Sequence, residues 1–134
     1  MNKYRIVIVE NDEDELLFMN EAFEASDSFE ILANAKNGNV LFEWLEQQPL
    51  SMFPEVILSD LNMPGKNGYD ILSEIQSDPR YAHIKVIITS TSSIKSVIDK
   101  CISLGAADFI PKPETFIDYE SFVVQLHQRI QNNQ

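Results

Sequence analysis

The alternation of two kinds of segment along the chain limits its fold more than any other feature. Short runs of β-branched and other apolar residues, typical of buried strands, cover residues 4–9, 29–35, 54–59, 84–89 and 108–111. Each run is followed by apolar residues at helical spacing, over about residues 16–23, 40–45, 69–76, 94–102 and 119–130. Strict alternation of this kind predicts parallel strands joined by right-handed crossovers, with helices covering both faces of the sheet.

Five such units in 134 residues predict a doubly wound α/β fold of the flavodoxin-like type. We expect a five-stranded parallel sheet in the order 2-1-3-4-5, five helices, and a single domain over residues 1–134. Pro111 supports this order, because proline lacks the N–H group that a central strand needs and is tolerated mainly on edge strands.

The charge of the chain restricts its partners. There are 21 Asp and Glu residues against 10 Lys and Arg, so the net charge is −11. A chain this acidic disfavours binding to nucleic acid or to an anionic membrane surface. Its one cysteine, Cys101, cannot form an internal disulfide, and no apolar run approaches the ~18 residues that cross a bilayer. We expect a cytoplasmic protein that contacts neither nucleic acid nor membrane.

Polar residues follow four of the predicted strands at the point where each strand ends. Glu10 and Asn11 follow the first strand, Asp60 the third, Thr89 ends the fourth, and Lys112 follows the fifth. In open parallel sheets ligands bind beyond the carboxyl ends of the strands, so two carboxylates, a hydroxyl and an ammonium should converge on one crevice.

Such a group of side chains has a specific chemical use. Converging carboxylates repel one another unless a cation lies between them, and oxygen ligands with room for water suit Mg²⁺. A carboxylate on Mg²⁺ beside an ammonium and a hydroxyl donor is what phosphoryl transfer to that carboxylate needs.

Four segments resemble the receiver domains of bacterial response regulators, which act in two-component signalling. They are residues 6–12 (IVIVEND), 56–68 (VILSDLNMPGKNG), 86–90 (VIITS) and 109–113 (FIPKP). The resemblance spans essentially the whole chain, in order and at the expected spacing, and the block from Asp60 to Gly68 with a distant Lys112 is its most specific part.

The resemblance assigns roles to the residues at the strand ends. It implies that Asp60 is the phosphoacceptor, that Thr89 donates its hydroxyl to the phosphoryl group, and that Lys112 pairs with that group. It further implies a cis Lys112–Pro113 bond and a conformational switch formed by Thr89 and Phe109.

The resemblance also implies a Mg²⁺ site, made by Glu10, Asn11, Asp60 and the backbone carbonyl of Asn62. Asn11 departs from the family pattern, in which an aspartate at this position touches the metal directly. Asparagine offers an oxygen but no charge, so the prediction is a weak Mg²⁺ site.

Other residues near the first strand have simpler interpretations. Asp12 is expected to cap the following helix, with Glu15 as its capping-box partner. Glu15, together with Glu13 and Asp14, is expected in a solvated first turn that favours the helix dipole. Cys101 belongs to a predicted core stripe on its helix, with residues Ile94, Val97, Ile98 and Ile102.

The function expected from the resemblance is a phosphorylation-dependent signalling switch. Asp60 would receive its phosphoryl group from a histidine kinase or a phosphotransfer protein, and the chain would not be an enzyme on an external substrate. A downstream protein, or a second copy in a homodimer, would bind the face formed by residues 94–102, 108–111 and 119–130, next to the exposed apolar pair Ile117 and Val124. Since the chain ends about 20 residues after Lys112, no output domain is expected.

Two other functions stay open. A pseudo-receiver would bind partners without phosphorylation, and Asn11 is the sequence feature that favours it. A phosphohydrolase of the haloacid dehalogenase type also uses a nucleophilic aspartate after a strand, but it needs a second acid two residues later, where this chain has Asn62.

Overall fold

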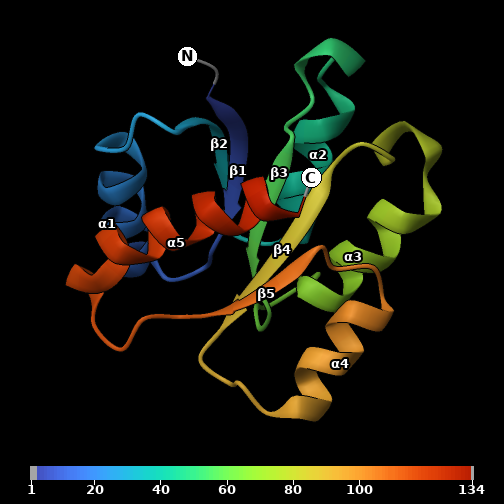
Figure 1. The fold of residues 1–134 in the computed structure, drawn as a ribbon. Helices are drawn as coiled ribbons and strands as arrows, with labels where there is room; N and C mark the ends of the chain where they lie inside the picture. Colours follow the sequence, from blue (N-terminus) through green and yellow to red (C-terminus); the bar gives the residue numbers. More distant parts are fainter. Residues whose placement is uncertain (1–2, 134) are drawn as a thin grey trace.

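The computed structural model describes residues 3–133. Its centre is a parallel sheet in the order β2-β1-β3-β4-β5, as the sequence predicted. Figure 1 shows the strands running through the middle of the molecule. Their bounds are β1 (Tyr4–Val9), β2 (Phe29–Ala35), β3 (Val56–Asp60), β4 (Lys85–Ser90) and β5 (Asp108–Pro111).

Five α-helices connect and follow the strands. They are α1 (Glu13–Glu24), α2 (Gly38–Glu46), α3 (Gly68–Ser77), α4 (Lys95–Ser103) and α5 (Tyr119–Asn132). Three short 3₁₀ helices lie in the connections, at η1 (Leu50–Met52), η2 (Pro79–Tyr81) and η3 (Phe116–Asp118). The sequence did not predict these short turns, since three residues carry too little periodicity to be recognised.

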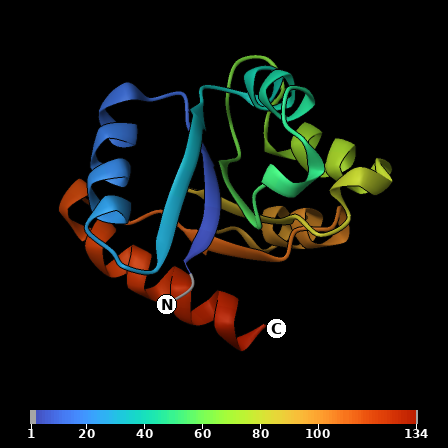
Figure 2. The same ribbon diagram turned by 90° about the horizontal axis from the view of Figure 1, so that it is seen from above.

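The helices cover both faces of the sheet (Figure 2). On one face, α1 and α5 pack against inward-facing strand residues that include Ile6, Ile8, Leu58 and Ile110. On the other face, α2, α3 and α4 pack against the alternate strand residues, which include Val7, Val9, Ile57, Val86 and Ile88. Because successive side chains of a strand point to opposite faces, each continuous apolar run supplies both cores.

Two sequence predictions need correction in their details. Strand β3 begins two residues later than the predicted run and ends one residue later, at Asp60, while β4 is shifted by one residue. Proline has no N–H to donate to the ladder, which explains why Pro54 lies outside β3.

The predicted core stripe of α4 is correct only in part. Cys101 is buried, and Val97 and Ile98 are partly buried and pack against the core, whereas Ile102 and the N-cap residue Ile94 are exposed. An apolar pattern shows which side of a helix can be buried, but the width that is buried depends on how closely the helix lies against its neighbours.

The sequence predicts that no apolar segment is long enough to cross a bilayer. Among residues 3–133, no helix has both the length and the apolar character that crossing a bilayer requires.

Candidate functional site

The register of the sheet brings the predicted site residues to one edge. Asp60 is paired with Thr89 across β3 and β4, and Ser90 is paired with Pro111 across β4 and β5. Lys112 follows immediately, and its N–H donates to the carbonyl of Ser90. On the other side of β3, Val9 is level with Ser59, so Glu10 stands beside Asp60. The ends of four neighbouring strands, β1, β3, β4 and β5, therefore supply the site.

Asp60 is a buried carboxylate, with 8% of the residue exposed. Its Oδ1 accepts a hydrogen bond of 2.8 Å from the backbone N–H of Leu61. Burial raises the pKa of Asp60 above its ordinary value of 3.8, although the nearby Lys112 ammonium acts in the opposite direction. The Asp60 carboxylate is therefore held in one orientation and is partly desolvated.

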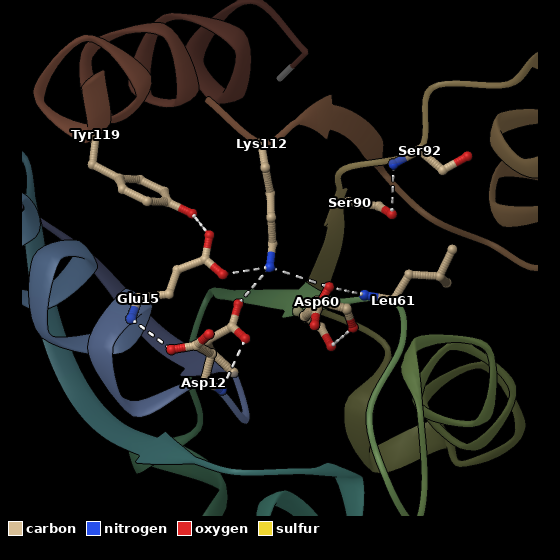
Figure 3. A network of polar contacts seen from close by, with 10 residues as sticks. Asp12, Glu15, Asp60, Leu61, Ser90, Ser92, Lys112 and Tyr119 are labelled. Atoms are coloured by element: carbon tan, nitrogen blue, oxygen red, sulfur yellow. Dashed lines mark hydrogen bonds and ion pairs between the residues drawn. The ribbon is translucent and has the colours of Figure 1, made fainter. Parts of the chain in front are cut away.

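Lys112 follows β5, and its side chain extends toward Asp60 and Glu15 (Figure 3). Its ammonium donates to Glu10 Oε1 and to Glu15 Oε1, both at 2.8 Å, and lies 3.4 Å from Asp60 Oδ1. Only 7% of the side chain is exposed. Burial alone would lower the pKa of Lys112, but the surrounding carboxylates raise it above the usual range, so the side chain stays charged.

Glu10 is the other buried carboxylate at the site. Besides its ion pair with Lys112, its Oε2 accepts a hydrogen bond of 3.1 Å from the backbone N–H of Asp12. Burial raises the pKa of Glu10, and the negative charge of Asp60 adds to this effect. Both oxygens of Glu10 are therefore engaged by the protein itself.

Thr89 supplies a hydroxyl with no partner. Its Oγ1 is fully buried, and within the described part of the chain it makes no hydrogen bond. A buried hydroxyl without a partner costs free energy, so it is a free donor within the protein. Thr89 is paired with Asp60 on the neighbouring strand, which places it at the same edge of the sheet.

The remaining predicted residues lie around this group. Phe109, on β5, is buried in the core that α2, α3 and α4 share. Asn11 and Asn62 are both exposed, in the segments that follow β1 and β3.

The donor atoms at this edge are oxygens, which is the kind of ligand that Mg²⁺ prefers. Two carboxylates are present, on Glu10 and Asp60, and an amide stands at Asn11. Among residues 3–133, no group of three or more Asp, Glu, His or Cys side chains is arranged to hold a metal ion. The residues thus fit Mg²⁺ by chemistry, although the Lys112 ammonium already lies beside both carboxylates and offsets part of their charge.

One implication of the resemblance is wrong in this structure. The Lys112–Pro113 peptide bond is trans, as are all peptide bonds in the described range. The trans form is intrinsically favoured by roughly 0.5–1 kcal/mol even before proline.

Glu15 and Tyr119 belong to the site, although the sequence did not place them there. Glu15 was expected to be solvated, yet only 12% of its side chain is exposed. Its Oε1 accepts from Lys112 and its Oε2 accepts a hydrogen bond of 2.5 Å from the Tyr119 hydroxyl. The expected capping box is therefore half formed: Asp12 accepts from the Glu15 N–H, but the Glu15 side chain turns inward.

The loop between β3 and α3 is held by the turn between β2 and α2. The Lys66 N–H donates to Asn39 Oδ1 at 2.9 Å, and the Gly38 N–H donates to the Lys66 carbonyl at 2.9 Å. Gly65 adopts a φ of 81°, which brings the two segments together. This contact fixes the course of the chain just after Asp60.

Comparison with known proteins agrees with this geometry. The family model described as the response regulator receiver domain matches residues 6–123. The two-component response regulator ORR12 of Oryza sativa subsp. japonica is 43% identical over 63 residues, covering 47% of this chain and 52% of that protein. A protein-glutamate methylesterase/protein-glutamine glutaminase of Clostridium acetobutylicum is 31% identical over 132 residues, covering 97% of this chain and 36% of that protein. The chain spans about half or less of the length of these relatives.

Solved structures agree as well. The phosphorylated cyanobacterial phytochrome response regulator RcpA superposes with a TM-score of 0.82 at 27% identity, covering 95% of this chain and 93% of that one. The Mn²⁺-bound form of response regulator Rcp1 gives 0.79 at 25% identity, covering 93% and 92%. With the family model matching most of its length and the strand-end residues in place, the chain belongs to the response regulator receiver domain family.

Proposed function

We propose that residues 1–134 act as one receiver domain that accepts a phosphoryl group on Asp60 from a histidine kinase or a phosphotransfer protein. Receiver domains serve phosphorylation-dependent signalling, and the family membership of this chain supports that role. The observation that carries the proposal is the arrangement of three groups at one edge of the sheet: a buried carboxylate on Asp60, an ammonium 3.4 Å away on Lys112, and the unpartnered hydroxyl of Thr89, which is paired with Asp60 across β3 and β4.

These groups suit a single displacement at phosphorus. An Asp60 carboxylate oxygen forms a bond to phosphorus as the bond from phosphorus to the donor nitrogen breaks, and the leaving imidazole keeps the electron pair. The three terminal oxygens of the phosphoryl group need positive charge and hydrogen-bond donors. Lys112 supplies the charge and Thr89 the neutral donor.

Receiver domains bind Mg²⁺ at acidic residues. In this chain Glu10, Asp60, the Asn11 amide and the Asn62 carbonyl would hold the ion, which neutralises phosphoryl charge when bound. We propose that its affinity is low, since Asn11 brings no charge and both Glu10 oxygens are already engaged by Lys112 and Asp12.

The proposal is tested by incubation with acetyl phosphate and Mg²⁺, followed by intact-mass measurement. Wild-type protein should gain the mass of one phosphoryl group, and Asp60→Ala should gain none. Asp14→Ala is the matched control, because it removes an exposed aspartate from the first turn of α1. An adduct of equal yield on Asp60→Ala would overturn the assignment.

The output surface is proposed to be the face made by α4, β5 and α5. This face carries exposed apolar side chains at Ile94 and Ile102 and at Val124 of α5, and Ile117 is exposed on η3, beside α1. Exposed aliphatic side chains of this kind favour a protein contact. The occupant would be a downstream protein or a second copy of the chain.

The chain has a second candidate function as a pseudo-receiver, which binds partners without being phosphorylated. The observation that favours it is the set of carboxylates around Lys112, which satisfies the ammonium without a phosphoryl group. The mass measurement separates the two functions, because a pseudo-receiver gains no mass in any variant.

A further inference from the structure

The side chain of Lys112 has three carboxylates around it, and one of them lies outside the residues with proposed roles in phosphorylation. Glu15 comes from the first turn of α1, and its Oε1 lies 2.8 Å from the ammonium. Figure 3 shows Glu15 and Asp60 on opposite sides of the Lys112 nitrogen. The two carboxylates therefore attract the same ammonium in opposite directions.

The distances show which carboxylate holds the ammonium more closely. Lys112 Nζ lies 2.8 Å from Glu10 and from Glu15, but 3.4 Å from Asp60. A charge-assisted hydrogen bond has its optimum near 2.7–2.9 Å, so the contact to Asp60 is longer than optimal by about 0.6 Å (3.4 minus 2.8). A phosphoryl oxygen on Asp60 would therefore compete with the Glu15 carboxylate for the same ammonium.

The negative charges around Lys112 also disfavour phosphorylation of Asp60. Before phosphorylation, Glu10, Glu15 and Asp60 contribute three negative charges against one positive charge on Lys112. Acyl phosphate formation replaces the Asp60 carboxylate by a group with roughly one more negative charge. Only 12% of the Glu15 side chain is exposed, so water screens its repulsion weakly.

Tyr119 fixes Glu15 in this position. The tyrosine is the first residue of α5, is almost completely buried, and donates its hydroxyl to Glu15 Oε2. The carboxylate thus has one oxygen on the phenol and the other on the ammonium. The buried Tyr119 ring has little room to move, so its hydroxyl holds the Glu15 carboxylate in one position.

We propose that Glu15 is a positioning residue that holds the Lys112 ammonium back from Asp60, and that Tyr119 keeps Glu15 in that place. The pair slows phosphoryl acceptance at Asp60 and reduces the amount of phosphorylated protein at equilibrium with a donor. This inference rests on the proposed phosphorylation of Asp60. It concerns the rate and extent of that reaction in this chain, whereas the proposed function concerns its site.

The test compares phosphorylation rates of wild type, Glu15→Gln and Glu13→Gln with acetyl phosphate and Mg²⁺, followed by intact mass. Glu15→Gln keeps the shape and removes the charge, and should raise the rate by roughly 5- to 10-fold, within the range of one ordinary net hydrogen bond. Glu13→Gln is the matched control, since it removes an exposed charge from the same helical turn. Its rate should equal that of wild type.

A second variant and a second readout separate positioning from a general structural effect. Tyr119→Phe removes one hydroxyl and should raise the rate in the same direction by a smaller factor, roughly 2- to 3-fold. In the protein without donor, Glu15→Gln should shift the Tyr119 ¹³Cζ resonance, because the phenol then donates to a neutral amide. A variant whose fold was merely disturbed would be phosphorylated more slowly than wild type, not faster.

The outcomes are distinct. A gain for Glu15→Gln and Tyr119→Phe, with no gain for Glu13→Gln, supports the inference. Equal or lower rates for Glu15→Gln, an equal gain for Glu13→Gln, or an unshifted Tyr119 resonance overturns it while leaving Asp60 phosphorylation intact. No adduct in any variant, wild type included, overturns the proposed function and this inference with it.

Discussion

Asn11 illustrates how one side chain can set the strength of a metal site. It stands next to Glu10 at the end of β1, where a family member is expected to have an aspartate, and it is exposed. The site is left with the carboxylates of Glu10 and Asp60, both of which lie close to Lys112. Attraction to Mg²⁺ is mainly Coulombic, so each missing charge weakens binding.

Replacement of Asn11 by aspartate should therefore strengthen Mg²⁺ binding. We expect the dissociation constant to fall by roughly 10-fold or more, since one added charge near a divalent ion contributes more than about 1 kcal/mol even at a high effective dielectric constant. Calorimetric titration of wild type and Asn11→Asp measures the change. Gln125→Asp adds the same charge at an exposed position of α5 and serves as control for net charge. Equal affinities would show that Asn11 does not limit the site.

The burial of Asp60 predicts a pH-dependent gain in stability when its charge is removed. Its pKa is raised above 3.8, so the folded state binds a proton more readily than the unfolded state, and the ionised form costs stability above the folded pKa. Asp60→Asn should raise the melting temperature at pH 7 by roughly 2–5 °C, the shift that about 1 kcal/mol gives in a domain of this size.

The gain from Asp60→Asn should shrink as the pH falls through the raised pKa, and should vanish below 3.8, where both states are protonated. Melting curves between pH 3 and pH 7 in metal-free buffer check this. Asp14→Asn removes an exposed carboxylate and should give no gain. A constant gain at all pH values would argue against burial of the charge as its cause.

Some site residues could be predicted from the sequence and others could not, for a physical reason. Asp60, Thr89 and Lys112 converge because parallel strands bring their carboxyl ends to one edge, and a run of apolar residues shows where each strand ends. Glu15 and Tyr119 meet because α1 and α5 pack side by side at a particular rotation. Helical periodicity predicts the buried face of each helix, but not which residues at its margin touch.

At the scale of elements, strands were located more accurately than loops. The bounds of β1, β2 and β5 agree with the predicted runs, because buried strands require unbroken apolar residues. The hydrogen bonds that join the β2–α2 turn to the β3–α3 loop could not be predicted, since they connect polar residues far apart in sequence. Such contacts depend on the folded arrangement rather than on local pattern.

The loop after β3 makes Gly65 sensitive to substitution. Its φ of 81° disfavours any residue with a Cβ, and an added Cβ would lie 2.6 Å from Asn39 Oδ1. Gly65→Ala should lower the free energy of unfolding by about 1–2 kcal/mol, measured by urea denaturation. The double variant Gly65→Ala/Asn39→Ala removes the clash but keeps the strained φ. If Gly65→Ala were as stable as wild type, the loop would not need this conformation.

At the scale of the whole molecule, the candidate site and the exposed apolar side chains lie in different places. The site lies where the strands end, while the exposed apolar side chains lie on α4, α5 and η3. Ile117 is 78% exposed and Val124 is 59% exposed, as the sequence predicted for this pair. The role of the pair in binding stays a prediction.

The double variant Ile117→Asp/Val124→Asp tests whether this surface supports association. If a second copy binds there, the variant should weaken self-association by at least 10-fold, because two charges would be buried in an apolar contact. Sedimentation of the phosphorylated protein measures it. Ser121→Asp/Gln125→Asp is the matched control, with the same added charge on exposed polar positions of α5. Unchanged association and unchanged partner binding would exclude this surface.

Few side chains of α4 are buried against the rest of the protein, and this affects the motions of the native state. This helix buries one residue, Cys101, and no side chain caps its N-terminus, whereas α5 buries five residues. Local opening should therefore require less free energy at α4 than at α5, so amide hydrogens of α4 should exchange with deuterium first. Mass spectrometry of peptides covering the two helices gives the comparison. Equal protection would mean that the domain opens only as a whole; unequal protection means that its proposed output helix can loosen while both cores stay closed.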